Sequence, residues 1–103
     1  MAQLQLDHLT STPASTVQFN GQVLLEEPEK FEIGVWGCSV GTWVRATKPF
    51  EFCYFISGSG TYTGEDGAVY KIRPDSGFTI RPNSKGTWNV TEDLRKIYAV
   101  FYD

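Results

Sequence analysis

Short segments rich in apolar residues recur along the chain from residue 17 onward, and within 31–36 apolar and other residues alternate with a period of two. Such alternation is typical of β-strands that bury one face, and no segment sustains the 3.6-residue period of an amphipathic helix. Turns rich in Gly, Pro and Asn separate the segments at even spacing. About ten short strands of this kind predict an all-β sandwich or barrel.

The expected strands share β-branched and aromatic residues and end at turn residues. They are a strand pair within 17–25 around an Asn20-Gly21 hairpin, then 31–36, 42–45, 50–56, 61–63, 68–72, 77–81, 87–90 and 96–102. Residues 64–67 predict a hairpin turn, and residues 91–94 predict one turn of helix at most. Both faces of the last strand carry bulky side chains, so we expect it to lie inside the structure and not at an edge.

The length of 103 residues suits a single domain. Residues 1–16 are polar and contain a proline, which predicts an N-terminal arm, and residues 17–103 then form one barrel domain. Leu4, Leu6 and Leu9 would let the arm pair as an edge strand, on this chain or on a second subunit. Because an exposed barrel edge favours pairing with another chain, we expect a homodimer.

The net charge and the cysteines limit the classes of binding partner and the cellular compartment that we expect. The net charge is −3 and no Lys/Arg cluster is present, so we predict neither a nucleic-acid nor a membrane partner. Residues 1–8 lack the basic and apolar regions of an export signal, which favours a cytoplasmic protein. In that compartment Cys38 and Cys53 are expected to be small buried side chains.

Several short motifs follow one another in a characteristic order. In residues 51–60, Glu51 begins an apolar strand that ends in a glycine turn. The other motifs are Trp36, Trp43, an Asp-Gly pair at 66–67, Gly-Thr-Trp at 86–88 and Arg-Lys-Ile-Tyr at 95–98. From about residue 31 to the C-terminus the chain resembles small single-domain cupins related to the barrel domains of ureidoglycine aminohydrolase. The resemblance implies the RmlC-like cupin fold, a double-stranded β-helix or jelly-roll barrel.

The same resemblance bears on metal binding. In metal-binding cupins three histidines accompany the glutamate that corresponds to Glu51, and their places fall here on Arg45, Thr47 and Gly86. Arginine does not lose its proton in a protein and glycine has no side chain, so one carboxylate would remain. We therefore predict no metal and no other cofactor. The only histidine, His8, belongs to the expected arm.

The polar and aromatic residues that remain are candidates for binding a small molecule in the barrel. They are Glu51, Lys96, Arg45, Trp43, Tyr54, Trp88 and Tyr98. A buried Glu51 either has a raised pKa and acts as a general base, or pairs with Arg45 or Lys96. Lys96 either packs its stem on Trp88 with its ammonium reaching outward, or contacts a ligand carboxylate.

Two further residues lie near the expected barrel mouth. Arg81 adds a cation there, and Asn83 tolerates a left-handed backbone in the turn that follows. Trp36 and the other two tryptophans either line a cavity at this mouth or fill the core.

Three functions are consistent with these residues, and whether the protein is an enzyme stays open. We favour a cupin that binds a small polar or carboxylate-bearing metabolite. The alternative is an enzyme of nitrogen or amino-acid metabolism similar to ureidoglycine aminohydrolase or to the ethanolamine-utilisation cupins. The third is a structural or interaction dimer in which the arm adds a strand to a neighbour.

Overall fold

The structure is a computed structural model that describes residues 17–102, and it contains seven β-strands over that range. The strands are β1 (Phe19–Glu27), β2 (Phe31–Cys38), β3 (Gly41–Thr47), β4 (Phe50–Gly64), β5 (Val69–Ile72), β6 (Gly77–Ile80) and β7 (Ser84–Phe101). The predicted arm at 1–16 lies outside the described residues. Within 17–102 no helix is long and apolar enough to cross a membrane.

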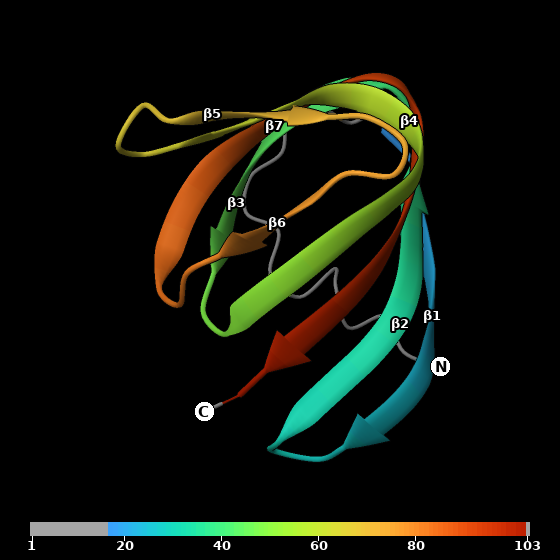
Figure 1. The fold of residues 1–103 in the computed structure, drawn as a ribbon, viewed down its shortest axis with the longest axis vertical. Coiled ribbons are helices and arrows are strands. Elements are labelled where there is room, and N and C mark those ends of the chain that lie inside the picture. Colours follow the sequence, from blue (N-terminus) through green and yellow to red (C-terminus); the bar gives the residue numbers. More distant parts are fainter. Residues whose placement is uncertain (1–16, 103) are drawn as a thin grey trace.

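Two long strands connect the two sides of the barrel. The order of pairing is β1-β2-β7-β4-β5, with β3 on β7 and β6 on β4, and all pairs are antiparallel. The first half of β7 pairs with β3 and its second half with β2, while β4 runs alongside both halves. Figure 1 shows β4 and β7 curving over the top of the view from one side of the barrel to the other. This architecture confirms the predicted all-β jelly-roll barrel.

The long strands correct several predicted boundaries. The structure joins the predicted strands 50–56 and 61–63 into the single strand β4. It likewise joins 87–90 and 96–102 into β7, which ends at Phe101, and the helical turn expected at 91–94 is part of this strand. The β4–β7 register shifts beside Ser57 and Ser59, and between them Gly58 adopts a φ of 102°. Bulges of this kind bend a strand without ending it, because the extra residue turns the chain while the ladder resumes beyond it.

The predicted hairpin at Asn20-Gly21 was wrong. Both residues lie within β1, where they pair with Gly37 and Trp36 of β2. The turn comes later in the chain, where the Lys30 amide donates to the Glu27 carbonyl across 2.9 Å. The left-handed φ of 55° at Asn83, in contrast, confirms the conformation expected for the turn before β7.

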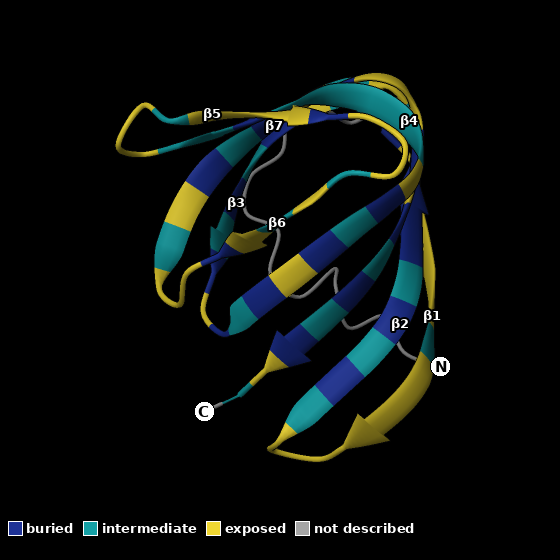
Figure 2. Cartoon of the chain, in the orientation of Figure 1, coloured by how far each residue is buried: buried dark blue, intermediate teal, exposed yellow. Residues whose placement is uncertain are grey.

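The side chains that point into the barrel form one aromatic core, and Figure 2 shows the alternation of buried and exposed positions along β4. Trp43 stacks on Trp88 with ring centroids 6.3 Å apart, and Trp36 lies 6.1 Å from Trp43. Cys38 and Cys53 are buried free thiols, as predicted. The last strand lies between β2 and β4, which confirms its predicted internal position.

Candidate functional site

A buried ion-pair cluster lies inside the barrel. Glu51, the second residue of β4, points inward and has no exposed surface. Its Oε1 lies 2.6 Å from Nη2 of Arg45 on β3, and its Oε2 lies 3.0 Å from Nζ of Lys96 on β7. Arg45 and Lys96 are themselves 3% and 1% exposed. Three of the predicted binding residues, from three different strands, therefore meet in one cluster.

The two cations determine the charge state of Glu51. Burial alone would raise the pKa of its carboxyl, but the charges of Arg45 and Lys96 and their hydrogen bonds lower it to about 2. The carboxylate is therefore ionised at neutral pH and holds its proton too weakly to serve as a general base. Of the two alternatives drawn from the sequence, pairing with a cation is confirmed, and the raised pKa was wrong.

Lys96 is enclosed by tryptophan rings. Its Nζ lies 4.8 Å from the ring centroid of Trp36 and 4.6 Å from that of Trp88, which is the geometry of a cation–π interaction. The sequence predicted that the stem of Lys96 packs on Trp88, and in the structure its ammonium lies over that ring. The outward-reaching ammonium was wrong, because the ammonium is buried on Glu51 and the stem does not extend to the surface.

Cys53 completes the cluster and was not recognised from the sequence. Its thiol lies 3.2 Å from Oε2 of Glu51, to which it donates, and Sγ accepts from Nζ of Lys96 across 3.5 Å. Burial, with the negative charge of Glu51, raises the pKa of the Cys53 thiol to about 12. It is therefore a neutral, unreactive member of the cluster at physiological pH.

The space over Gly86 is filled by Tyr62, which sequence reasoning also missed. Gly86 pairs in register with Arg45, and a Cβ at this glycine would lie 2.4 Å from the Tyr62 ring. The Tyr62 ring lies 4.8 Å from that of Trp88. Burial raises the pKa of the Tyr62 phenol, while nearby Arg45 opposes that rise. Tyr62 thus lies within electrostatic reach of the ion-pair cluster.

The interior also holds buried donors without acceptors. Five such groups have no hydrogen-bond partner among the described residues: Nε of Arg45, the hydroxyl of Thr47 and the indole N–H groups of Trp36, Trp43 and Trp88. Buried polar groups are normally satisfied, and each orphan costs about 1–3 kcal/mol. All five are able to donate, so the interior has an excess of donors that an added acceptor would satisfy.

Two predicted binding residues lie elsewhere. Tyr54 alternates with Glu51 and Cys53 and so points to the outer face of β4, where its hydroxyl donates to Asp75 across 2.8 Å. Tyr98 does point inward, but its hydroxyl donates to the buried Glu32 across 3.0 Å. The structure therefore does not bring Tyr54 to the cluster, and it places Tyr98 in a second, adjoining polar group.

The residues present do not fit the metal centre that the fold family often carries. The four positions implied by the resemblance do converge. Arg45 pairs with Gly86, Thr47 follows on the same inward face of β3, and Glu51 contacts Arg45. An arginine and a glycine supply no metal ligand, and both oxygens of Glu51 already contact cations. Among residues 17–102 no cluster of His, Cys, Asp and Glu could hold a metal ion.

Several solved structures share the fold of this chain. The Clostridium difficile EutQ protein is 18% identical with a TM-score of 0.77, and the match covers 95% of this chain and 79% of that one. A DUF861 family protein from Thermotoga maritima is 27% identical with a TM-score of 0.61, over 80% of this chain and 100% of the other. The Schizosaccharomyces pombe Cnp3 cupin domain is 21% identical with a TM-score of 0.70, over 84% and 68%.

The family itself follows from the sequence profile. Residues 25–98 match the EutQ-like cupin domain, and the chain belongs to that family. No curated protein matches the sequence. The cupin resemblance is thus confirmed, whereas the finer likeness to ureidoglycine aminohydrolase stays a prediction.

Proposed function

We propose that this cupin binds a small carboxylate-bearing molecule inside the barrel, at Arg45 and the donors around it. The observation that carries the proposal is the excess of buried donors described above. A carboxylate has two oxygens and about four acceptor sites, so it suits a site whose free groups are N–H and O–H donors. We propose no metal in this site.

The charge of the cluster supports an anionic ligand. Two cations, Arg45 and Lys96, share the single carboxylate of Glu51, which leaves the cluster with one positive charge in excess. Buried charges are stable when paired, so a ligand carboxylate would complete the pairing. The flat guanidinium of Arg45 is suited to this role because its Nε and Nη atoms are able to donate in parallel to two carboxylate oxygens.

A substitution at Thr47 tests the proposed carboxylate site, because the Thr47 hydroxyl is buried and has no hydrogen-bond partner among the described residues. Thr47→Val replaces that hydroxyl by a methyl group of similar size. The free protein should become more stable by about 1 kcal/mol, because an unsatisfied polar group is removed. Carboxylate binding should weaken at the same time, because a donor to the ligand is lost.

The experiment measures thermal unfolding of both proteins with and without acetate, propionate and butyrate, followed by calorimetric titration. A bound carboxylate raises stability by mass action, by about 2.7 kcal/mol at a hundredfold excess over Kd. Thr42→Val is a matched control, since the Thr42 hydroxyl is on the exposed side of β3 and already bonds Asn89. No stabilisation of the wild-type protein by any small carboxylate would overturn the proposal.

An enzymatic role is a second candidate, and the match to the EutQ-like family favours it. It is the ethanolamine-utilisation form of the alternative drawn from the sequence, with ureidoglycine-type chemistry as its other form. The lowered pKa of Glu51 and the raised pKa of Cys53 leave this cluster without a ready base or nucleophile. Turnover of amino or ureido compounds by the purified protein, lost in Glu51→Gln, would favour this candidate over simple binding.

We further propose that the protein is a homodimer that pairs through the outer face of the β2-β7-β4 sheet. Nine outward residues form a grid of three neighbouring rows across these strands: Phe31, Phe101 and Phe50; Ile33, Ala99 and Phe52; Val35, Ile97 and Tyr54. We call this grid the outer apolar patch. Phe52 and Phe101 are 40% and 44% exposed.

A second copy is the occupant that the outer apolar patch fits. An isologous dimer sets a surface against itself, and the patch contains no charged residue that would then meet a like charge. Antiparallel sheets usually face water with polar side chains, so an apolar outer face indicates a protein contact. We keep the cytoplasm as the proposed compartment, in accord with two buried free thiols.

A further inference from the structure

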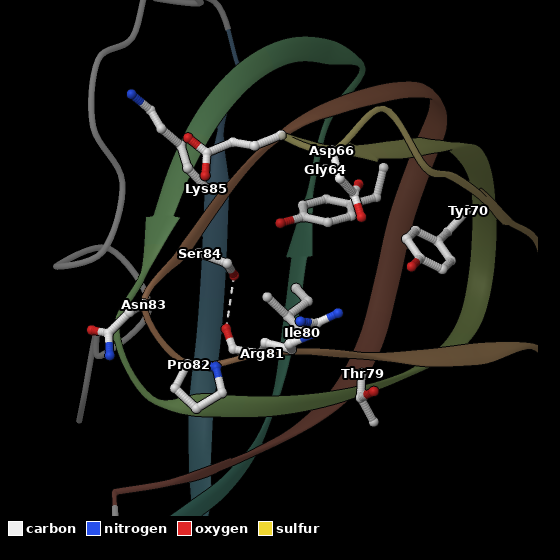
Figure 3. A pocket seen from close by; sticks show the side chains of 12 residues that line it. Gly64, Asp66, Tyr70, Thr79, Ile80, Arg81, Pro82, Asn83, Ser84 and Lys85 are labelled. Carbon is white, nitrogen blue, oxygen red and sulfur yellow. Dashed lines mark hydrogen bonds between the residues drawn. The ribbon is translucent and has the colours of Figure 1, made fainter.

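A hollow of about 340 Å³ is lined by residues from the end of β4, from β5 and β6, and from the start of β7. Figure 3 shows it from close by, with Tyr70, Asp66, Arg81 and Ser84 around it. The volume lies within the range of about 300–1,000 Å³ typical of small-molecule pockets. The function proposed above leaves this hollow, and the cation at Arg81, without a role.

Two buried residues of the hollow's lining are neighbours of the cluster through the strand pairing and packing. Ile80 lines it and pairs in register with Glu51, and Tyr62 lines it while covering Gly86, the register partner of Arg45. Both Ile80 and Tyr62 are buried. A ligand that reaches the cluster from this mouth therefore passes Tyr62 and leaves its other end in the hollow.

The polar groups around the hollow carry both signs of charge. Arg81 and Lys85 supply cations and Glu65 and Asp66 supply carboxylates, and none of the four belongs to an ion pair among residues 17–102. Asp66 uses one oxygen to accept from the Ala68 amide across 2.9 Å, which fixes its orientation and leaves its second oxygen for another donor. Opposite charges that face a cavity and do not pair with each other are suited to a ligand end bearing an ammonium and a carboxylate.

Building on the proposed carboxylate site, we propose that the ligand is a short amino dicarboxylate, in the manner of an acidic amino acid. One carboxylate enters the barrel toward Arg45. The ammonium at the other end is bound by Asp66, and the second carboxylate by Arg81. The rings of Tyr62 and Tyr70, with centroids 6.4 Å apart, flank the methylene groups between the two ends.

The test compares L-glutamate, glutarate and 4-aminobutyrate by calorimetric titration. Glutarate lacks the amino group, and 4-aminobutyrate keeps it while lacking the second carboxylate. The wild-type protein should bind L-glutamate about tenfold more tightly than either analogue, since one charge-assisted hydrogen bond contributes about 1.5–3 kcal/mol. Equal affinity for L-glutamate and glutarate in the wild-type protein would overturn the inference.

Two variants test which residue binds the ammonium of the ligand and which binds its second carboxylate. Asp66→Asn should remove the preference for L-glutamate over glutarate, and Arg81→Gln should remove the preference for L-glutamate over 4-aminobutyrate. Lys71→Gln, on the exposed strand β5 and outside the hollow, is the matched control and should change neither ratio. Unchanged ratios in both mouth variants would likewise overturn the inference.

The same titrations distinguish a failure of the subsite at the mouth from a failure of the proposed carboxylate site inside the barrel. Binding of small monocarboxylates that weakens in Thr47→Val, with no effect of the mouth variants, would leave the barrel site standing and overturn the mouth subsite. Failure of every carboxylate to bind would overturn both.

Discussion

The carboxylate of Glu51 and the ammonium of Lys96 lie 3.0 Å apart across the β4–β7 pairing, although 45 residues separate them in the sequence. Arg45 approaches the same carboxylate from a third strand. Because all three side chains are almost fully buried, removal of Glu51 leaves two buried cations without a counter-ion, whereas removal of either cation leaves one ion pair. The stability of the barrel is therefore tied to the charge state of this cluster.

Glu51→Gln should destabilise the protein strongly. The change leaves Arg45 and Lys96 buried without their counter-ion, and breaking a buried ion pair in this way costs about 3–5 kcal/mol. Chemical denaturation followed by tryptophan fluorescence measures the loss. Glu26→Gln is the control, because Glu26 is exposed and should change the free energy of unfolding by less than about 0.5 kcal/mol. A loss below about 1 kcal/mol in Glu51→Gln would show that the pairing contributes little.

Acid should release this stabilisation in a defined window. The pKa of Glu51 is lowered to about 2 in the folded protein, so its contribution is complete above the ordinary glutamate pKa of about 4.3 and is lost as pH falls toward 2. Carbon NMR of the Glu51 carboxyl should show no titration from pH 7 down to about 4. A midpoint at or above the ordinary value would contradict the ion-paired state.

Both thiols should resist modification in the folded protein. Burial raises the pKa of Cys38 and of Cys53 to about 12, so neither forms an appreciable thiolate at pH 8. A colorimetric thiol reagent should therefore react slowly with the native protein and rapidly with both cysteines in denaturant. Rapid reaction of Cys53 without unfolding would show that the cluster opens to solvent.

Gly86→Ala should be destabilising because the Tyr62 ring occupies the space for a Cβ. Overpacking of this kind typically costs about 1–3 kcal/mol. Tyr62→Leu should recover part of that loss when it is combined with Gly86→Ala, which a double-mutant cycle measures. Additive effects in the cycle would show that Tyr62 is not what fills the place of the missing side chain.

Phe52→Glu should convert the proposed dimer to a monomer, because it sets a charge from each copy into the outer apolar patch. Light scattering during gel filtration measures the mass directly. Val69→Glu is the matched control, since Val69 is 59% exposed on β5 and lies outside the patch. A monomeric wild-type protein at micromolar concentration would contradict the proposed dimer.

The sequence predicts the fold well because the period-two alternation and the turn residues are local signals. It predicts strand ends less well, because Gly and Ser residues occur both at bulges, where a strand bends and continues, and at turns, where a strand ends. The run from Ser57 to Gly60 is such a case. Residues beyond it change sides, so Glu51 and Tyr62 both face inward although they lie an odd number of positions apart. Alternation counted from Glu51 would instead place Tyr62 on the outer face of β4.

The candidate site was only partly predictable for a similar physical reason. Alternation shows that Glu32 and Trp36 lie on one side of β2 and Ile33 on the other. It does not show which of the two sides faces the interior, and in the structure it is the side of Glu32 and Trp36. The ion pairs of Glu51 depend on which strands are neighbours, and that is a non-local property. The sequence therefore identified Arg45, Glu51 and Lys96 as candidates, and only the structure shows the two cations sharing one carboxylate.

We infer that a positively charged cluster at Arg45, Glu51 and Lys96 stands where other cupins hold a metal. A side-by-side titration of the metal-free protein with a small carboxylate and with manganese, zinc and nickel distinguishes this anion site from a metal site. We predict saturable carboxylate binding that raises the unfolding temperature, with no saturable binding of any of the three metals. Stoichiometric metal binding with stabilisation, and no response to carboxylates, would contradict it.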